Sequence, residues 1–221
     1  MTDEATLNGA MDRYACGDQT AFPVLHRALY PRLLAFLTRL SGSAGMADDL
    51  VQETFLRMHR ARSTFAPGGA VIPWAYAIAR NAHIDYTRGA RLRSTERLPS
   101  DPGPDPAFAQ RAEAESAAIA AQTARVVERV LARIPAAQRD AFVLLRYEGL
   151  SVQDAAAVLG ATPTAVKLRA FRAYEALRAE IDELKSKAAG GAPKTDASAA
   201  NRPKPAPPEK RRKASAPSEG E

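Results

Sequence analysis

Basic side chains gather on one predicted helix near the end of the chain, where they could bind the phosphates and base edges of a nucleic acid. They are Lys167, Arg169 and Arg172. The segment 148–175 predicts two short helices around a tight turn. Ser151 and Thr162 can cap the two helix starts, Gly160 favours a left-handed helix end, and Pro163 favours a first helical position. This pattern is typical of a helix-turn-helix, whose second helix enters the DNA major groove. An ordinary helical hairpin with a solvated basic face is the alternative.

Acidic side chains gather instead in the segment 46–62. Its apolar residues recur at helical spacing and predict an inward stripe of Leu50, Val51, Phe55 and Met58. Asp48 and Asp49 are explained by the helix dipole alone, since negative charge is favourable near a helix N-terminus. The polar patch continues beyond that first turn, through Gln52, Glu53 and Leu56. We interpret the continued patch as a binding face for an electropositive partner.

Aromatic rings alternate with cations and amides in the helix predicted after Pro73. The group consists of Tyr76, Arg80, Asn81, Tyr86, Arg88 and Arg91. Such a mixture suits single-stranded nucleic acid, because rings stack on bases while guanidinium groups follow the phosphates. A solvated set of arginines is the alternative. Trp74 differs from the group, since its spacing to Ala77 and Ile78 favours a place in the core.

The elements that position these groups are predicted to be helices. Apolar residues recur at three- and four-residue spacing from Phe22 to Leu40, and Pro31 within this run predicts two helices or one kinked helix. Prolines at 102, 104 and 106 predict an extended linker. From Lys185 onward the chain has little apolar bulk and holds most of the net charge of +6, which predicts a disordered basic tail.

The expected fold class is therefore all-α, with two small helical domains joined by a Pro-rich linker and followed by a disordered C-terminal tail. The boundaries are placed at residues 1–93 for the first domain, 94–120 for the linker, 121–184 for the second domain and 185–221 for the tail.

Enzymatic chemistry is not expected, because the sequence offers no phosphate loop, metal cluster or nucleophile-base group. No catalytic residue, metal ligand or cofactor is assigned. The single cysteine, Cys16, cannot form an internal disulfide, which fits a reducing cytoplasm. The chain start lacks the pattern of a signal peptide, and no apolar stretch is long enough to span a bilayer. Without sustained heptads, the free chain is expected to be a monomer.

Three stretches, in this order, resemble motifs of the extracytoplasmic-function sigma factors of bacterial RNA polymerase. The core-polymerase-binding helix of that family is matched by DDLVQETFLRMHRA. Its promoter-melting segment is matched by PWAYAIARNAHIDYTR. Its helix-turn-helix for the upstream promoter element is matched by IPAAQRDAFVLLRYEGLSVQDAAAVLGATPTAVKLRAFRAYEAL. The likeness covers roughly residues 22–184, and the long tail departs from the family's minimal pattern.

The resemblance implies a role for several of these side chains. Core RNA polymerase would be contacted by Asp49, Gln52, Glu53 and Leu56. The minus-ten promoter element would be contacted by Phe65, Trp74, Arg80, Asn81 and Arg88. Within that set, Asn81 and the loop 65–72 would trap a base flipped from the non-template strand. The minus-thirty-five element would be contacted by Thr164, Lys167, Arg169 and Arg172.

The implied function is promoter-specific transcription initiation, in which the chain binds core RNA polymerase, recognises minus-thirty-five DNA and melts the minus-ten element. The resemblance also implies an anti-sigma factor that masks both surfaces. A stand-alone helix-turn-helix regulator is the alternative, but it leaves the acidic and aromatic segments unexplained. Because a flexible linker cannot fix the separation of two DNA-binding units, we expect weak promoter binding by the isolated chain and tight binding with polymerase.

Overall fold

The computed structural model describes residues 3–94 and 114–189, and within these ranges the chain forms helices and turns with no strand. This confirms the predicted all-α class. The first bundle contains α1 (Glu4–Ala15), the 3-10 turn η1 (Gln19–Ala21), α2 (Phe22–Ser41), α3 (Ala44–Ala61), the 3-10 turn η2 (Arg62–Thr64) and α4 (Val71–Ser94). The second contains α5 (Ala114–Arg133), α6 (Ala136–Arg146), α7 (Val152–Leu159) and α8 (Pro163–Ala189).

The first bundle is built around α2. Its helical stripe is buried as the spacing predicted, with Leu25, Leu29, Leu33, Phe36, Leu37 and Leu40 in the core. The helix runs without a break through Pro31, so the two-helix alternative is wrong. Pro31 lies on the exposed side of α2, where the carbonyl that loses its N–H partner is reached by water.

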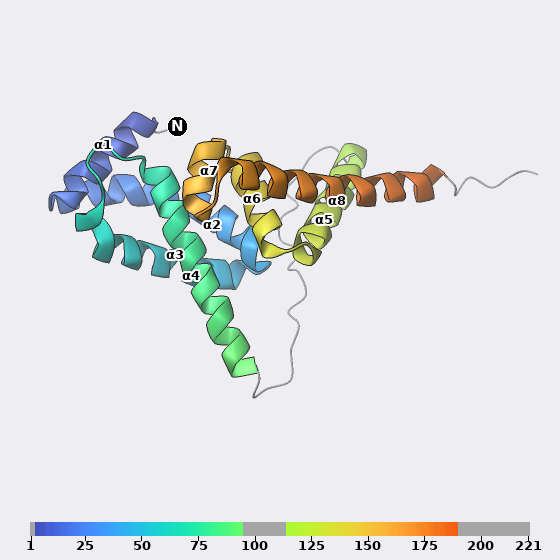
Figure 1. The fold of residues 1–221 in the computed structure, drawn as a ribbon, viewed down its shortest axis with the longest axis horizontal. Helices are drawn as coiled ribbons and strands as arrows, with labels where there is room; N and C mark the ends of the chain where they lie inside the picture. Colours follow the sequence, from blue (N-terminus) through green and yellow to red (C-terminus); the bar gives the residue numbers. More distant parts are fainter. Residues whose placement is uncertain (1–2, 95–113, 190–221) are drawn as a thin grey trace, which may run out of the picture.

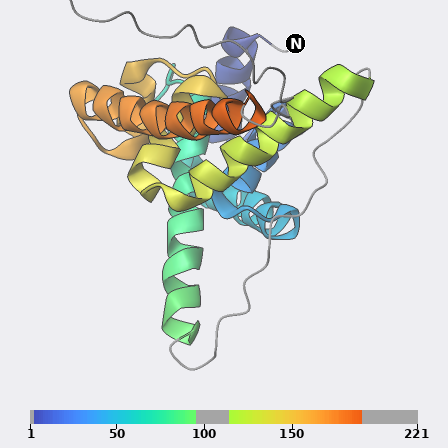
Figure 2. The ribbon, with the colours of Figure 1, turned by 90° about the vertical axis from the view of Figure 1, so that its right-hand side faces the viewer.

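The second bundle holds the predicted helix-turn-helix in α7 and α8. Figure 2 shows α5 lying across α8, where Val126 and Val130 pack against Leu177 in a small apolar cluster. Helix α8 continues to Ala189, past the boundary expected at Lys185. Of the expected linker, residues 95–113 lie outside the described residues, as do residues 190–221 of the expected tail, and residues 114–120 belong to α5.

Helix α4 joins the two bundles in space. It packs against α2 and α3 on one side and contacts α7 on the other, while its C-terminal end projects away from both bundles (Figure 1). One apolar cluster therefore continues from the α2 core through Tyr76 and Ala79 of α4 to Leu144 and Ala155 of the second bundle. The two bundles thus share a buried contact.

Candidate functional site

Asp49 and Glu53 of α3 lie on the face that points away from the α2 core, whereas Asp48 accepts a hydrogen bond from the Tyr30 hydroxyl of α2 at 2.6 Å. Ser43 caps this helix by accepting a hydrogen bond from the backbone N–H of Met46 at 3.4 Å. The predicted inward stripe is buried, namely Leu50, Val51, Phe55 and Met58. The remaining surface, here called the acidic face, consists of Asp49, Gln52, Glu53 and Leu56. All but the half-buried Glu53 are exposed, so the face is open to a partner.

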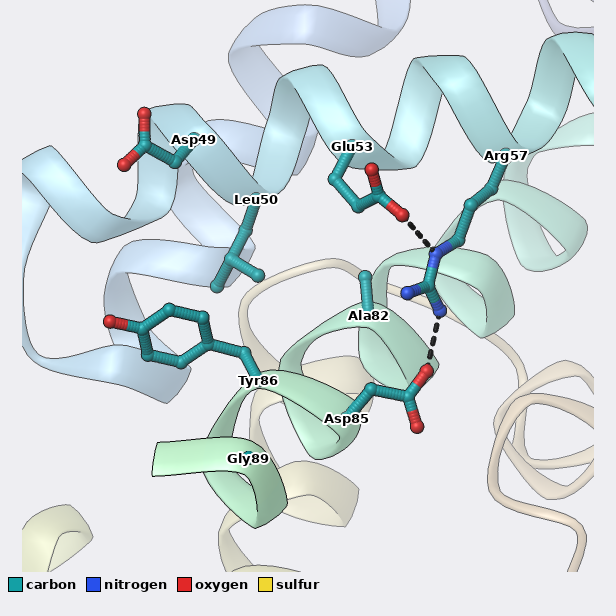
Figure 3. Close-up of a pocket in the computed structure, with 8 residues that line it drawn as sticks. All are labelled: Asp49, Leu50, Glu53, Arg57, Ala82, Asp85, Tyr86 and Gly89. Carbon is teal, nitrogen blue, oxygen red and sulfur yellow. Dashed lines mark hydrogen bonds and ion pairs between the residues drawn. The ribbon is translucent and has the colours of Figure 1, made fainter. Parts of the chain in front are cut away.

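A cleft of about 390 Å³ lies beside the acidic face, between α3 and α4 (Figure 3). The Arg57 guanidinium bridges it, donating from Nε to Glu53 at 2.7 Å and from Nη1 to Asp85 at 2.6 Å. These two hydrogen bonds, with Glu53 the stronger, hold the pKa of Arg57 above its ordinary value. Asp49 adds a third carboxylate to the lining. Since one cation stands against three carboxylates, the cleft suits a cationic group of a partner.

Of the expected minus-ten residues, Asn81 and Arg88 are exposed on α4. The other three are engaged inside the protein. The Phe65 ring is buried and packs edge-on against the half-buried Trp74, with centroids 5.1 Å apart. This agrees with the placement of Trp74 at the core. Arg80 is held by the second bundle.

The prediction that Tyr76 presents a surface ring is wrong. Its side chain is only 2% exposed, and it packs edge-on against Phe36 of α2. Spacing alone could not reveal this, because the partners of the side chain are distant in sequence: the ring packs on α2 and the hydroxyl donates to Glu148. Tyr86 is exposed as expected.

Two acidic side chains of the second bundle bind α4 and α2 across the shared contact. Asp140 of α6 accepts a hydrogen bond from Arg80 Nε at 2.8 Å, with side-chain exposures of 5% and 19%. Its other carboxylate oxygen lies 3.8 Å from Arg139 Nε, too far for a hydrogen bond but close enough for charge attraction. Glu148, after α6, accepts from the Tyr76 hydroxyl and, at 3.2 Å, from Arg39 Nη1. Arg80 is therefore already paired with a carboxylate of this protein at the contact between the bundles.

Burial shifts the titration of two groups at the contact. Loss of hydration raises the pKa of Glu148, although the hydrogen bond from Tyr76 and the charge of Arg39 oppose the shift. Loss of hydration also lowers the pKa of His83 on α4, and the nearby Arg139 charge adds to the effect. The lowered pKa makes His83 less readily protonated than a solvated histidine, and the raised pKa makes Glu148 more readily protonated than a solvated glutamate.

The helix-turn-helix has the caps that the sequence predicted. Ser151 Oγ accepts from the backbone N–H of Asp154 at 3.0 Å, and Gly160 ends α7 with a φ of 56°. Thr162 Oγ1 accepts from the N–H of Ala165 at 3.2 Å at the start of α8. The basic face of α8 consists of Thr164, Lys167, Arg169 and Arg172. Arg169 is half-buried and the other three are exposed.

Sequence reasoning missed several residues at these surfaces. Large apolar side chains are exposed on α8 among the basic ones, namely Leu168, Phe171 and Tyr174. Their positions among the basic residues of the predicted second helix were a sequence signal that could have placed them on the exposed face. Asp140 lies directly before Ala141, a small apolar residue that is buried, and this position beside the core was a weaker signal. The partners of Glu148 lie far away in sequence, and no local pattern identifies them.

Within residues 3–94 and 114–189, no group of His, Cys, Asp and Glu is arranged to hold a metal ion. Among the same described residues, no helix is both long and apolar enough to cross a membrane.

Comparison with known families places two matches on this chain. The family described as Sigma-70 region 2 matches residues 25–93, and the one described as Sigma-70, region 4 matches residues 124–177. The chain is 34% identical to the RNA polymerase sigma factor CarQ of Myxococcus xanthus over 79% of this chain and 97% of that one. It is 35% identical to the ECF RNA polymerase sigma factor SigF of Caulobacter vibrioides, over 80% of this chain and 95% of that one.

Two solved structures share the fold. The sigma factor RpoE of Bartonella quintana, in complex with the anti-sigma factor NepR, superposes with a TM-score of 0.61 at 24% identity. That match covers 73% of this chain and 96% of the other. CnrH, in complex with the cytosolic domain of CnrY, superposes with a TM-score of 0.58 at 26% identity, over 80% and 98% of the two chains.

Proposed function

Because this chain belongs to the extracytoplasmic-function sigma factors of bacterial RNA polymerase, we propose that its two helical bundles divide promoter recognition between them. The chain is a sigma factor that binds core RNA polymerase and directs promoter-specific transcription initiation. The first bundle binds polymerase and the minus-ten element, and the second binds the minus-thirty-five element. The observation that carries this division is that an open acidic face on α3 and an open basic face on α8 belong to different bundles.

The acidic face and the adjoining cleft bind a cationic surface of polymerase. The exposed Leu56 adds an apolar contact at the end of the face. Glu53→Lys reverses a charge at the mouth of the cleft, and it should weaken binding to core polymerase about tenfold. Glu128→Lys, on the exposed side of α5, is the matched control and should leave the affinity unchanged. Equal affinities of both variants, measured by fluorescence anisotropy, would show that polymerase binds elsewhere.

The basic face of α8 binds the minus-thirty-five element. Arg172→Ala should weaken binding of the holoenzyme to duplexes carrying that element about five- to 150-fold, the usual range for a lost arginine contact to a base. Arg178→Ala is the control, because Arg178 lies further along α8 in an exposed ion pair with Asp182. Core polymerase binding should be normal in both variants. An Arg172→Ala holoenzyme with unchanged DNA affinity would remove this assignment.

Minus-ten recognition requires the two bundles to separate. Asn81 and Arg88 are accessible on α4, but Arg80 is paired with Asp140 and is covered by the second bundle. In this closed arrangement, with the two bundles in contact, the Arg80 cation is therefore unavailable to promoter DNA. It becomes available when polymerase separates the bundles. By likeness to the two solved relatives, an anti-sigma factor binds this chain and keeps it from polymerase.

A stand-alone helix-turn-helix regulator would use only the second bundle. Gel shifts of promoters selected from a random library distinguish the two functions. The proposed function predicts weak binding by the chain alone and tight, specific binding after core polymerase is added. Equally tight specific binding without polymerase would favour the regulator.

A further inference from the structure

The loop before α4 has little structure of its own. Residues 65–70 separate η2 from α4 and include Pro67, Gly68 and Gly69. Gly68 has a φ of 71°, a left-handed conformation that favours glycine. Within the loop, one turn hydrogen bond joins the Gly69 N–H to the Ala66 carbonyl at 2.9 Å. A glycine-rich segment of this kind needs contacts from elsewhere to hold a single conformation.

Those contacts come from α1, at the other end of the first bundle in sequence. Asp12 Oδ1 accepts a hydrogen bond from the backbone N–H of Gly68 at 3.0 Å. Asn8 Oδ1 accepts one from the backbone N–H of Val71 at 3.0 Å. The two side chains lie four residues apart and so share one face of α1. Together they hold the tip of the loop and the first residue of α4, whose N–H has no partner within the helix.

Helix α1 is itself firmly placed. Leu7, Met11 and Tyr14 are buried in the core of the first bundle. The Tyr14 hydroxyl hydrogen-bonds His59 Nδ1 at 2.6 Å, which ties α1 to the last turn of α3. The loop is thus held by a helix that is itself fixed, by its buried side chains and by the Tyr14–His59 hydrogen bond.

The inner side of the loop also packs against a buried side chain. The buried Phe65 ring lies under Gly69, where an added Cβ would come within 2.8 Å of the Ala66 carbonyl oxygen and 3.2 Å of Phe65 Cζ. The exposed part, Ala66 to Gly68, offers mainly backbone and small side chains to solvent. Such a surface can present its shape and its backbone groups to a flipped base. Both depend on where the backbone is held.

We propose that Asn8 and Asp12 are positioning residues for minus-ten recognition, because they fix the base-facing loop and the start of α4 against α1. This inference rests on the proposed function, in which the first bundle binds the minus-ten element, and on the expectation that the loop and Asn81 make that contact. The two residues touch no DNA themselves. They determine how selectively the loop accepts one base over another.

The test uses holoenzyme reconstituted from the full chain and core polymerase, with promoters selected from a library randomised at the minus-ten element. Open complexes are measured on the selected promoter and on single-base variants of it. The Asn8→Ala/Asp12→Ala double variant should lose preference for the selected base by about two- to tenfold for each hydrogen bond removed. Asn8→Asp and Asp12→Asn each keep an Oδ1 acceptor and should retain most of the preference.

Three controls separate positioning from general effects. Thr6→Ala is exposed on α1 and should change nothing. Leu33→Ala removes a buried side chain of α2, so it should lower the melting temperature while leaving the base preference unchanged. If Leu33→Ala reduces the preference as much as the double variant does, or if the double variant keeps full preference, the positioning role is overturned. Asn81→Ala tests the underlying assignment separately, since unchanged base preference in that variant would refute the proposed function and not the α1 contact.

Discussion

The closed contact between the bundles leads to a measurable prediction for Asp140→Ala. The substitution removes the carboxylate that accepts from Arg80 Nε at 2.8 Å and leaves a guanidinium that is only 19% exposed without this partner. A charge-assisted hydrogen bond contributes about 1.5–3 kcal/mol. The lower end applies here, because the part of the Arg80 side chain that is exposed lets water solvate the guanidinium once the carboxylate is gone. About 1.5 kcal/mol shifts the ratio of open to closed chains about tenfold.

The opening can be followed by energy transfer between dyes on the two bundles. Cys16 is exposed in the first bundle, and Ala179→Cys provides an exposed second position on α8. Transfer should fall in Asp140→Ala. Binding to a single-stranded minus-ten oligonucleotide should tighten by up to the same tenfold, because the Arg80 cation becomes available to phosphate.

A matched control is available on α8. Asp182→Ala removes a carboxylate from an ion pair with Arg178 at 3.7 Å, in which both side chains are more than 60% exposed. Such a pair contributes little, so transfer and binding should stay at their original values. If Asp140→Ala folds normally yet also leaves both measurements unchanged, the proposed closed state does not depend on the Arg80 contact and the reasoning is wrong.

Three further predictions concern single side chains. Phe171 is 59% exposed on α8, so Phe171→Ala should keep the melting temperature but weaken binding to the minus-thirty-five duplex about fivefold through loss of apolar contact with the DNA; unchanged binding would place the ring outside the interface. Burial lowers the pKa of His83 from 6.5, so His83 is protonated in the unfolded chain at a higher pH than in the folded chain. The free energy of unfolding should therefore fall as pH drops below 6.5. The raised pKa of Glu148 acts in the opposite sense, since the stabilisation that it contributes is lost as pH rises. Urea unfolding of wild type and His83→Leu at pH 7.5 and 5.5 isolates the contribution of the histidine. Identical pH dependence of the two proteins would contradict its role. Ser151→Ala removes the α7 cap and should lower the free energy of unfolding by about 0.5–2 kcal/mol, with Ser151→Asp restoring most of it; equal urea midpoints for all three proteins would argue against the cap.

Local patterns in the sequence were sufficient for the core stripes of α2 and α3 and for the acidic and basic faces. The α2 stripe and the α3 stripe are buried as their spacing predicts, because a helix that packs on one side must place apolar residues every third or fourth position. Caps at Ser151 and Gly160 were readable for the same reason, since each involves neighbours within four residues. The acidic face of α3 could be predicted in the same way, because it consists of α3 positions that do not face the core.

The contact between the bundles depends on the tertiary structure. Tyr76 and Glu148 are 72 residues apart, and Arg80 and Asp140 are 60 apart, so no helical period relates them. Asn8 and Asp12 likewise meet the loop before α4 at separations of 63 and 56 residues. The sequence by itself determined which residue types stand on the helix faces that we propose for polymerase and DNA. Folding decided which of them are engaged by the protein's own charges, because burial and distant partners, rather than residue type, set whether a cation such as Arg80 is free.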